Sequence, residues 1–115
     1  MIFVFGSNEA GIHGAGAAKA AYMHHGAIWG RGWGLQGNSF AIPTKDWNIV
    51  TLPLIKIEQY VTWFLDYTCE HPELVFQVTR IGCGLAGYTD SQIGPMFKGA
   101  PKNVKFFEAT WEDYR

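Results

Sequence analysis

Two apolar, strand-like runs pass directly into glycine-rich segments, and this arrangement constrains the fold more than any other feature of the sequence. The first run covers residues 2–5 and leads into the loop 6–16; the second covers residues 74–78 and leads into the loop 81–88. A continuous apolar run such as residues 2–5 is typical of a strand buried on both faces of a parallel sheet, and residues 74–78 also predict a strand. Ligands of such sheets bind beyond the carboxyl ends of the strands. Both loops are therefore predicted to lie at one binding edge.

Strands and helices alternate along most of the remaining chain. Residues 15–23 are rich in alanine, which predicts a helix, and residues 55–70 repeat apolar side chains at the i, i+3, i+4 spacing of an amphipathic helix. Residues 39–42 predict a strand that Pro43 ends, and residues 104–108 predict the last strand. This alternation predicts a single α/β domain with a mostly parallel sheet and helices packed on its faces.

Three segments are less regular. Residues 26–37 are dense in glycine and are predicted to form a loop. Trp29, Arg31 and Trp33 alternate in it; they either close over a base by stacking or tuck the loop onto the core. Residues 47–54 fit neither element clearly. Asp90 or Thr89 is predicted to cap a short helix that extends to Phe97.

Composition and charge exclude several classes of function. The formal net charge is −1, so no basic excess is present to neutralise a nucleic-acid backbone, and nucleic acid is not an expected partner. The two cysteines, Cys69 and Cys83, fit neither a metal site nor a disulfide framework. The apolar run at residues 2–5 is too short for a signal peptide or a membrane span. We therefore expect a soluble cytoplasmic protein, in the host cytoplasm if a phage encodes it, with no membrane partner, metal or cofactor.

The first glycine-rich loop has the chemistry of a phosphate site. Its glycines let the main chain approach a ligand closely, and the helix that follows presents free N–H groups and a partial positive charge. Asn8 offers an amide to a base or ribose, and His13 is suited to donate to a phosphate or to act as an acid or base. A tight turn without a ligand is the alternative. The candidate ligand-binding residues are Ser7, Asn8, Gly11, His13, Gly14 and Gly16.

The second glycine-rich loop repeats this arrangement after another strand. It is apolar and carries no acidic side chain, which suits a diphosphate held mainly by main-chain N–H groups. Its aromatic residue is placed to stack on a ribose or base. The candidate ligand-binding residues here are Ile81, Gly82, Cys83, Gly84, Leu85, Ala86, Gly87 and Tyr88.

Three segments resemble the macro domain superfamily, whose members bind ADP-ribose. Residues 78–85 (VTRIGCGL) resemble the second phosphate loop of small macro-domain hydrolases that remove ADP-ribose from carboxylate side chains. Residues 13–18 (HGAGAA) are similar to the first glycine loop of that branch, and residues 40–45 (FAIPTK) to its middle strand. The chain is also similar to a compact set of phage and bacterial macro-like proteins. The resemblance covers most of the chain outside residues 47–56 and the C-terminal tail, and it implies one compact macro-like three-layer α/β/α domain over residues 1–115.

The resemblance implies binding of ADP-ribose or a related NAD-derived nucleotide through the two loops. The alternative is an ADP-ribosyl hydrolase with a non-standard catalytic set, because Ala86 stands where the hydrolase branch has an acidic residue. The candidates for that set are Lys19, His13, Asp46 and Asp90. A third hypothesis is an interaction protein whose glycine loops have no ligand. The sequence gives no indication of the oligomeric state.

Overall fold

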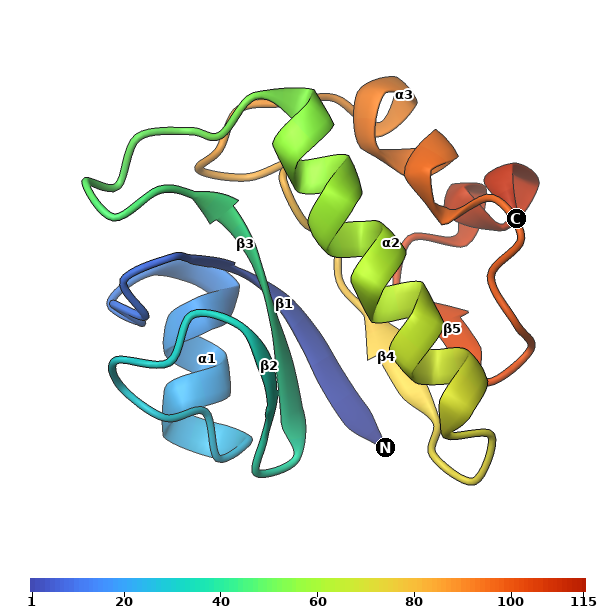
Figure 1. The fold of residues 1–115 in the computed structure, drawn as a ribbon, viewed down its shortest axis with the longest axis horizontal. Coiled ribbons are helices and arrows are strands. Elements are labelled where there is room, and N and C mark those ends of the chain that lie inside the picture. Colours follow the sequence, from blue (N-terminus) through green and yellow to red (C-terminus); the bar gives the residue numbers. More distant parts are fainter.

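Five strands form one mixed sheet in the order β2-β3-β1-β4-β5 in the computed structural model, which describes residues 1–115 (Figure 1). β1 runs parallel to both of its neighbours, β3 and β4, and β4 runs parallel to β5. Only β2 is antiparallel to its neighbour β3. The prediction of a mostly parallel sheet is therefore confirmed. The strands are β1 (Ile2–Asn8), β2 (Gly34–Gln36), β3 (Ser39–Lys45), β4 (Phe76–Val78) and β5 (Val104–Phe106).

Helices flank this sheet. The two longer ones, α1 (Gly16–His24) and α2 (Leu54–Glu70), lie on different sides of it (Figure 1) and begin and end within a residue of the predicted positions. None of the helices combines the length and the apolar content that crossing a membrane requires. The short helical segments are α3 (Asp90–Ile93) and the 3₁₀ helices η1 (Gly94–Phe97) and η2 (Ala109–Tyr114).

The alternation of side chains along β1 divides the core into two parts. Val4 packs in a cluster with Ile57 and Phe64 of α2, whereas the next residue, Phe5, packs with Ala21 of α1. Successive side chains of a strand point to opposite faces of the sheet, so each face is covered by its own helix. Burial of each large apolar side chain contributes about 1.5–3 kcal/mol to stability. β1 is thereby fixed at the centre of the sheet, with its carboxyl end between those of β3 and β4.

β3 runs through Pro43, so the prediction that this proline ends the strand is wrong. Ser7 of β1 pairs with Pro43, and the ladder shifts its register directly after this pair. β2 pairs only with residues 39–41, so the other edge of β3 is open at Pro43. A proline costs a strand little where its missing N–H faces an unpaired edge. The extension brings Lys45 to the carboxyl edge of the sheet.

The glycine-dense segment 26–37 is a loop for most of its length but also contains β2. It packs main chain to main chain against the end of β1. A Cβ at Gly32 would lie 2.1 Å from the carbonyl oxygen of Asn8, and a Cβ at Gly11, where φ is +72°, would lie 2.3 Å from the amide nitrogen of Arg31. No side chain fits in either place, so this contact requires glycine on both sides.

The C-terminal part follows the prediction more closely. Thr89 is the N-cap of α3, and its amide donates to Oε1 of Gln92 (2.9 Å). The helical segment continues as η1 to Phe97, as predicted. η2 was not predicted, and the irregular segment before α2 contributes one isolated bridge between Lys45 and Thr51.

Candidate functional site

A cavity of about 510 Å³ opens at the carboxyl ends of β1, β3 and β4. Its size falls within the range of small-molecule sites. Both glycine-rich loops line it, so the structure brings together two segments that are far apart in the sequence. The predicted binding residues that line the cavity are Ser7, Asn8, Gly14, Gly16, Ile81, Gly82, Gly84, Leu85 and Ala86.

The start of α1 presents unused N–H groups to this cavity. Ala15 occupies the N-cap position in an extended conformation, and no side chain caps the helix. The amides of residues 14–18 donate no hydrogen bond within the protein, and all five residues line the cavity. An uncapped helix start carries about half a positive elementary charge, which attracts anions.

The loop after β4 contributes a second set of unused N–H groups. Internal turn bonds shape this loop: the amide of Cys83 donates to the carbonyl of Arg80 (3.2 Å), and that of Tyr88 donates to the carbonyl of Gly82 (2.9 Å). Of the residues of this segment that line the cavity, Thr79 and Ile81 also use their amides, which donate to the carbonyls of Val4 (3.1 Å) and Thr79 (2.7 Å). The other lining residues have amides that make no internal hydrogen bond: Arg80, Gly82, Gly84, Leu85 and Ala86. We call these N–H groups, together with those of residues 14–18, the amide cradle.

The two parts of the cradle lie next to each other. A Cβ added to Gly16 at the start of α1 would lie 3.8 Å from Cδ1 of Leu85. Leu85 therefore lies beside the first turn of the helix. The two segments thus border the same part of the cavity.

Lys45 and Arg80 are the charged residues among those that line the cavity, and no acidic residue lines it. Lys45 makes no ion pair. Arg80 donates from Nε and Nη2 to the two carboxylate oxygens of Asp90 (2.9 Å each). The cavity is thus electropositive through Lys45 and the main chain, while the charge of Arg80 is shared with a partner.

Asp90 stabilises the second loop from outside the cavity. It also accepts a hydrogen bond from Nε1 of Trp111 (2.8 Å). The hydrogen bonds from Arg80 and then from Trp111 lower the pKa of the Asp90 carboxyl below its usual value. Arg80 and Asp90 lie at the two ends of the second glycine-rich loop, so their ion pair holds these two ends close together.

Several predicted residues do not line the cavity. His13 is almost fully buried; its Nε2 lies 3.0 Å from the carbonyl oxygens of Ile28 and Arg31 and therefore donates to the main chain of the glycine-dense loop. Its Nδ1 has no hydrogen-bond partner. The other predicted binding residues outside the cavity are Gly11, Cys83, Gly87 and Tyr88.

Two of these side chains have structural environments. The Tyr88 hydroxyl donates to the carbonyl of Leu52 (2.7 Å), which ties the second loop to the segment before α2. Burial, followed by the negative charge of Asp90, raises the pKa of the Cys83 thiol to about 11, so the reactive thiolate is suppressed.

Asn8 lines the cavity, but its amide exchanges two hydrogen bonds of 2.9 Å with the main chain of Ile12.

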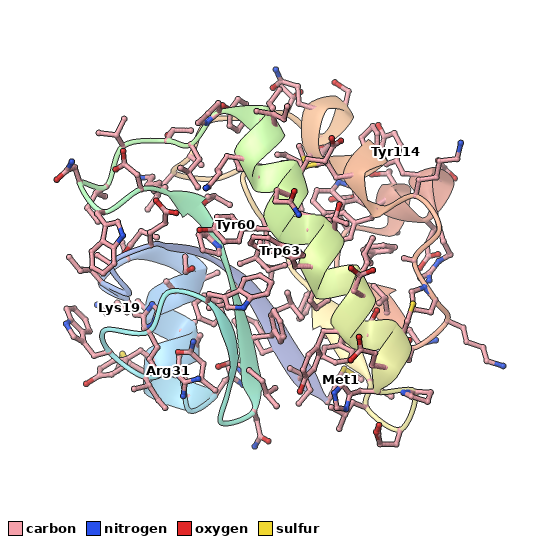
Figure 2. All side chains as sticks on the ribbon, in the orientation of Figure 1. Met1, Lys19, Arg31, Tyr60, Trp63 and Tyr114 are labelled. Atoms are coloured by element: carbon pink, nitrogen blue, oxygen red, sulfur yellow. The ribbon has the colours of Figure 1, made fainter.

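None of the four catalytic candidates lines the cavity. Lys19 is exposed on α1 (Figure 2), and His13 and Asp90 are engaged as described. Asp46 organises the turn after β3, because its Oδ1 accepts from the amides of Asn48 (2.8 Å) and Val50 (3.0 Å). No group of three or more His, Cys, Asp or Glu side chains is placed to hold a metal ion.

The aromatic residues of the glycine-dense loop do not line the cavity either. Trp33 packs against Phe40 (5.2 Å between ring centroids), Tyr60 (5.5 Å) and Trp63 (6.2 Å). Tyr60 and Trp63 project from α2 toward β3 (Figure 2). Trp33 therefore follows the second interpretation, in which the loop is tucked onto the core. Trp29 is 52% exposed and packs beside Tyr22 of α1 (5.5 Å between ring centroids).

Sequence reasoning missed more than half of the cavity lining. Lys45 is the last residue of β3, so the rule that ligands bind at the carboxyl ends of strands identifies it once β3 is extended through Pro43. Ile49 lies in a segment without a clear pattern, and nothing in the sequence singles it out. The lining residues that were not predicted are Gly6, Ile12, Ala15, Ala17, Ala18, Thr44, Lys45, Ile49, Thr79 and Arg80.

Comparison of the chain with models of protein families, with curated proteins and with solved structures gave no match. The geometry and chemistry of the site are therefore the basis for inferring the function.

Proposed function

We propose that this chain binds ADP-ribose or a related NAD-derived nucleotide in the cavity, with the diphosphate held by the amide cradle. The observation that carries the proposal is that two separate sets of unused N–H groups line one cavity that no acidic residue lines. Main-chain N–H groups at a helix start and in a glycine loop are suited to phosphate oxygens. Lys45 at the rim adds a positive charge.

The cavity favours a nucleotide over a simple anion. Its volume of about 510 Å³ is much larger than one phosphate requires and is suited to a ligand of nucleotide size. The cradle has two parts, and each matches one phosphate of a diphosphate. The resemblance of residues 13–18 and 78–85 to the phosphate loops of macro domains supports the same ligand, and the macro-like three-layer assignment forms part of this proposal.

Substitutions at Gly84 test the proposal. A Cβ at Gly84 meets no atom within 4 Å, and its φ lies outside the left-handed region, so a side chain there leaves the fold intact. Gly84→Glu places a negative charge at the cradle and is expected to weaken ADP-ribose binding at least about tenfold in isothermal titration calorimetry. Gly84→Gln, which has the same shape without the charge, is the matched control and is expected to bind within about threefold of the unsubstituted chain.

Two results would contradict the proposal. One is an unsubstituted chain that does not bind ADP-ribose, ADP or pyrophosphate at millimolar concentration. The other is an equal loss of affinity in the Glu and Gln variants, because the charge of the ligand would then have no part in its recognition.

A further inference from the structure

Three branched apolar side chains line the cavity while remaining exposed to solvent. They come from three different segments: Ile12 from the loop after β1 (43% exposed), Ile49 from the turn after β3 (41%) and Leu85 from the loop after β4 (71%). Single exposed apolar residues need no explanation. Three that border one cavity form an apolar rim beside the amide cradle.

The main chain of Ile49 adopts a conformation that is unfavourable for isoleucine. Its φ is +64°, and it is the one residue other than glycine with a positive φ. A β-branched residue is strained in this region, whereas glycine or asparagine adopts it readily. Strain of this kind persists only where the surrounding structure enforces it.

The surrounding hydrogen bonds enforce the turn without using the Ile49 side chain. The amide of Asp46 donates to the carbonyl of Val50 (2.8 Å), and the amide of Ile49 donates to the carbonyl of Asp46 (3.1 Å). The Thr51 hydroxyl donates to the carbonyl of Ala86 (3.0 Å), which ties this segment to the second glycine loop. All of these bonds are compatible with glycine at position 49, so they do not account for an isoleucine there.

We infer that Ile49, with Ile12 and Leu85, forms an apolar subsite for a planar heteroaromatic ring of the anionic ligand, and that Ile49 determines specificity for that ring. This inference rests on the proposed function. A flat ring gains from contact on its faces while its polar edge stays in water, which suits side chains at a half-exposed rim. The binding free energy of an alkyl chain grows with the apolar area that it buries, and three exposed side chains at a rim do not surround such a chain. The Asn8 amide is held by Ile12, so recognition of the ring relies on apolar contact.

The test compares a ligand with the ring and one without it. Isothermal titration calorimetry measures ADP and inorganic pyrophosphate on the unsubstituted chain and on Ile49→Ala and Ile49→Gly. Both variants are expected to bind ADP about fivefold more weakly and pyrophosphate within twofold. Val50→Ala removes an exposed side chain from the same turn that does not line the cavity, and it is expected to leave both affinities unchanged.

The stability of the same variants separates a binding role from a structural one. Ile49→Gly relieves the strained φ, so its thermal unfolding temperature is expected to equal or exceed that of the unsubstituted chain, although its ADP affinity falls. Unchanged ADP affinity in both variants, with pyrophosphate still bound, would overturn the inference and leave the proposed function standing. If Ile49→Ala weakens the binding of octyl phosphate as much as that of ADP, the subsite binds an alkyl chain and the inference of a ring is overturned. If the unsubstituted chain binds neither ADP nor pyrophosphate, the proposed function itself fails.

Discussion

Polar side chains around the cavity make most of their hydrogen bonds to the main chain. Nε2 of His13 donates to two carbonyls of the glycine-dense loop, the Asn8 amide holds the main chain of Ile12, and the Tyr88 hydroxyl donates to Leu52. These bonds fix the loops before any ligand arrives. Because the loops of the amide cradle are already ordered, binding a ligand there costs less conformational entropy.

The ion pair between Asp90 and Arg80 makes a prediction about pH. The lowered pKa of Asp90 means that its charged form is favoured in the folded state, so its contribution to stability is present above the pKa of the unfolded chain and is lost as the pH falls through the lower folded value. Asp90→Asn is therefore expected to lower the free energy of unfolding at pH 7. This difference from the unsubstituted chain is expected to shrink as the pH falls below about 4. Urea unfolding between pH 7 and pH 3 measures it.

An aspartate on α2 serves as the control. Asp66 is exposed and forms no ion pair, so Asp66→Asn is expected to follow the stability profile of the unsubstituted chain. A destabilisation by Asp90→Asn that stays constant down to pH 3 would show that the charge of Asp90 is not what holds the loop.

The sequence predicts glycines and strand ends better than it predicts the roles of polar side chains. Gly82 and Gly84 follow an apolar run, so their place at the cavity follows from local pattern alone. The burial of His13 depends on the carbonyls of Ile28 and Arg31, which lie 15 and 18 residues away in the sequence. No local pattern reveals such partners. A histidine in a glycine loop is therefore assigned to a site by its type, although its contacts give it a structural role.

Among the elements, α1 shows a conflict between stability and binding. An uncapped helix start is less stable than a capped one, and here it leaves the amides of residues 14–18 unused. A capping side chain at position 15 would accept hydrogen bonds from the amides of Ala17 or Ala18, which belong to the cradle. The alanine at this position is consistent with a helix start that keeps its amides for a ligand.

Ala15→Asp is expected to stabilise the protein and to weaken ligand binding. The cap contributes about 1 kcal/mol to the free energy of unfolding in urea. The same carboxylate occupies cradle amides and repels an anion, so ADP-ribose affinity measured by calorimetry is expected to fall at least about tenfold. Ala15→Asn caps without a charge and is expected to give an intermediate loss. Unchanged affinity in Ala15→Asp would remove α1 from the proposed site.

Regular elements were predictable where one residue pattern extends over several turns or a whole strand. α2 is amphipathic over its full length, so its bounds followed from periodicity. β2 is three residues long and lies among glycines, but it forms a hairpin with β3 through the two-residue turn Gly37-Asn38, in which φ of Gly37 is +59°. A glycine-asparagine pair is a local signal for such a turn, and the many other glycines of the segment obscure it. Pro43 was misleading because a proline ends a strand only where its N–H is needed, and the open edge of β3 is not visible in the sequence.

At the scale of the whole molecule, the sheet order creates the site. β1 stands between β3 and β4, and all three run in the same direction, so their carboxyl ends meet at one edge. The alternation of elements predicted this convergence of the two glycine loops. It could not predict the turn after β3, which reaches the cavity through its hydrogen bond from Thr51 to the second loop.

This convergence predicts that both parts of the amide cradle respond to one binding event. In a titration with ADP-ribose followed by amide nuclear magnetic resonance, the signals of Gly16, Ala17, Gly84 and Leu85 are expected to shift along a single isotherm, because one diphosphate contacts both segments. The amide signals of Lys102 and Lys105, which border a separate surface hollow near the C-terminus, serve as the internal reference and are expected not to shift. Two distinct dissociation constants for the two segments would mean that the loops, although neighbours in space, form separate sites, and that the cradle does not act as one unit.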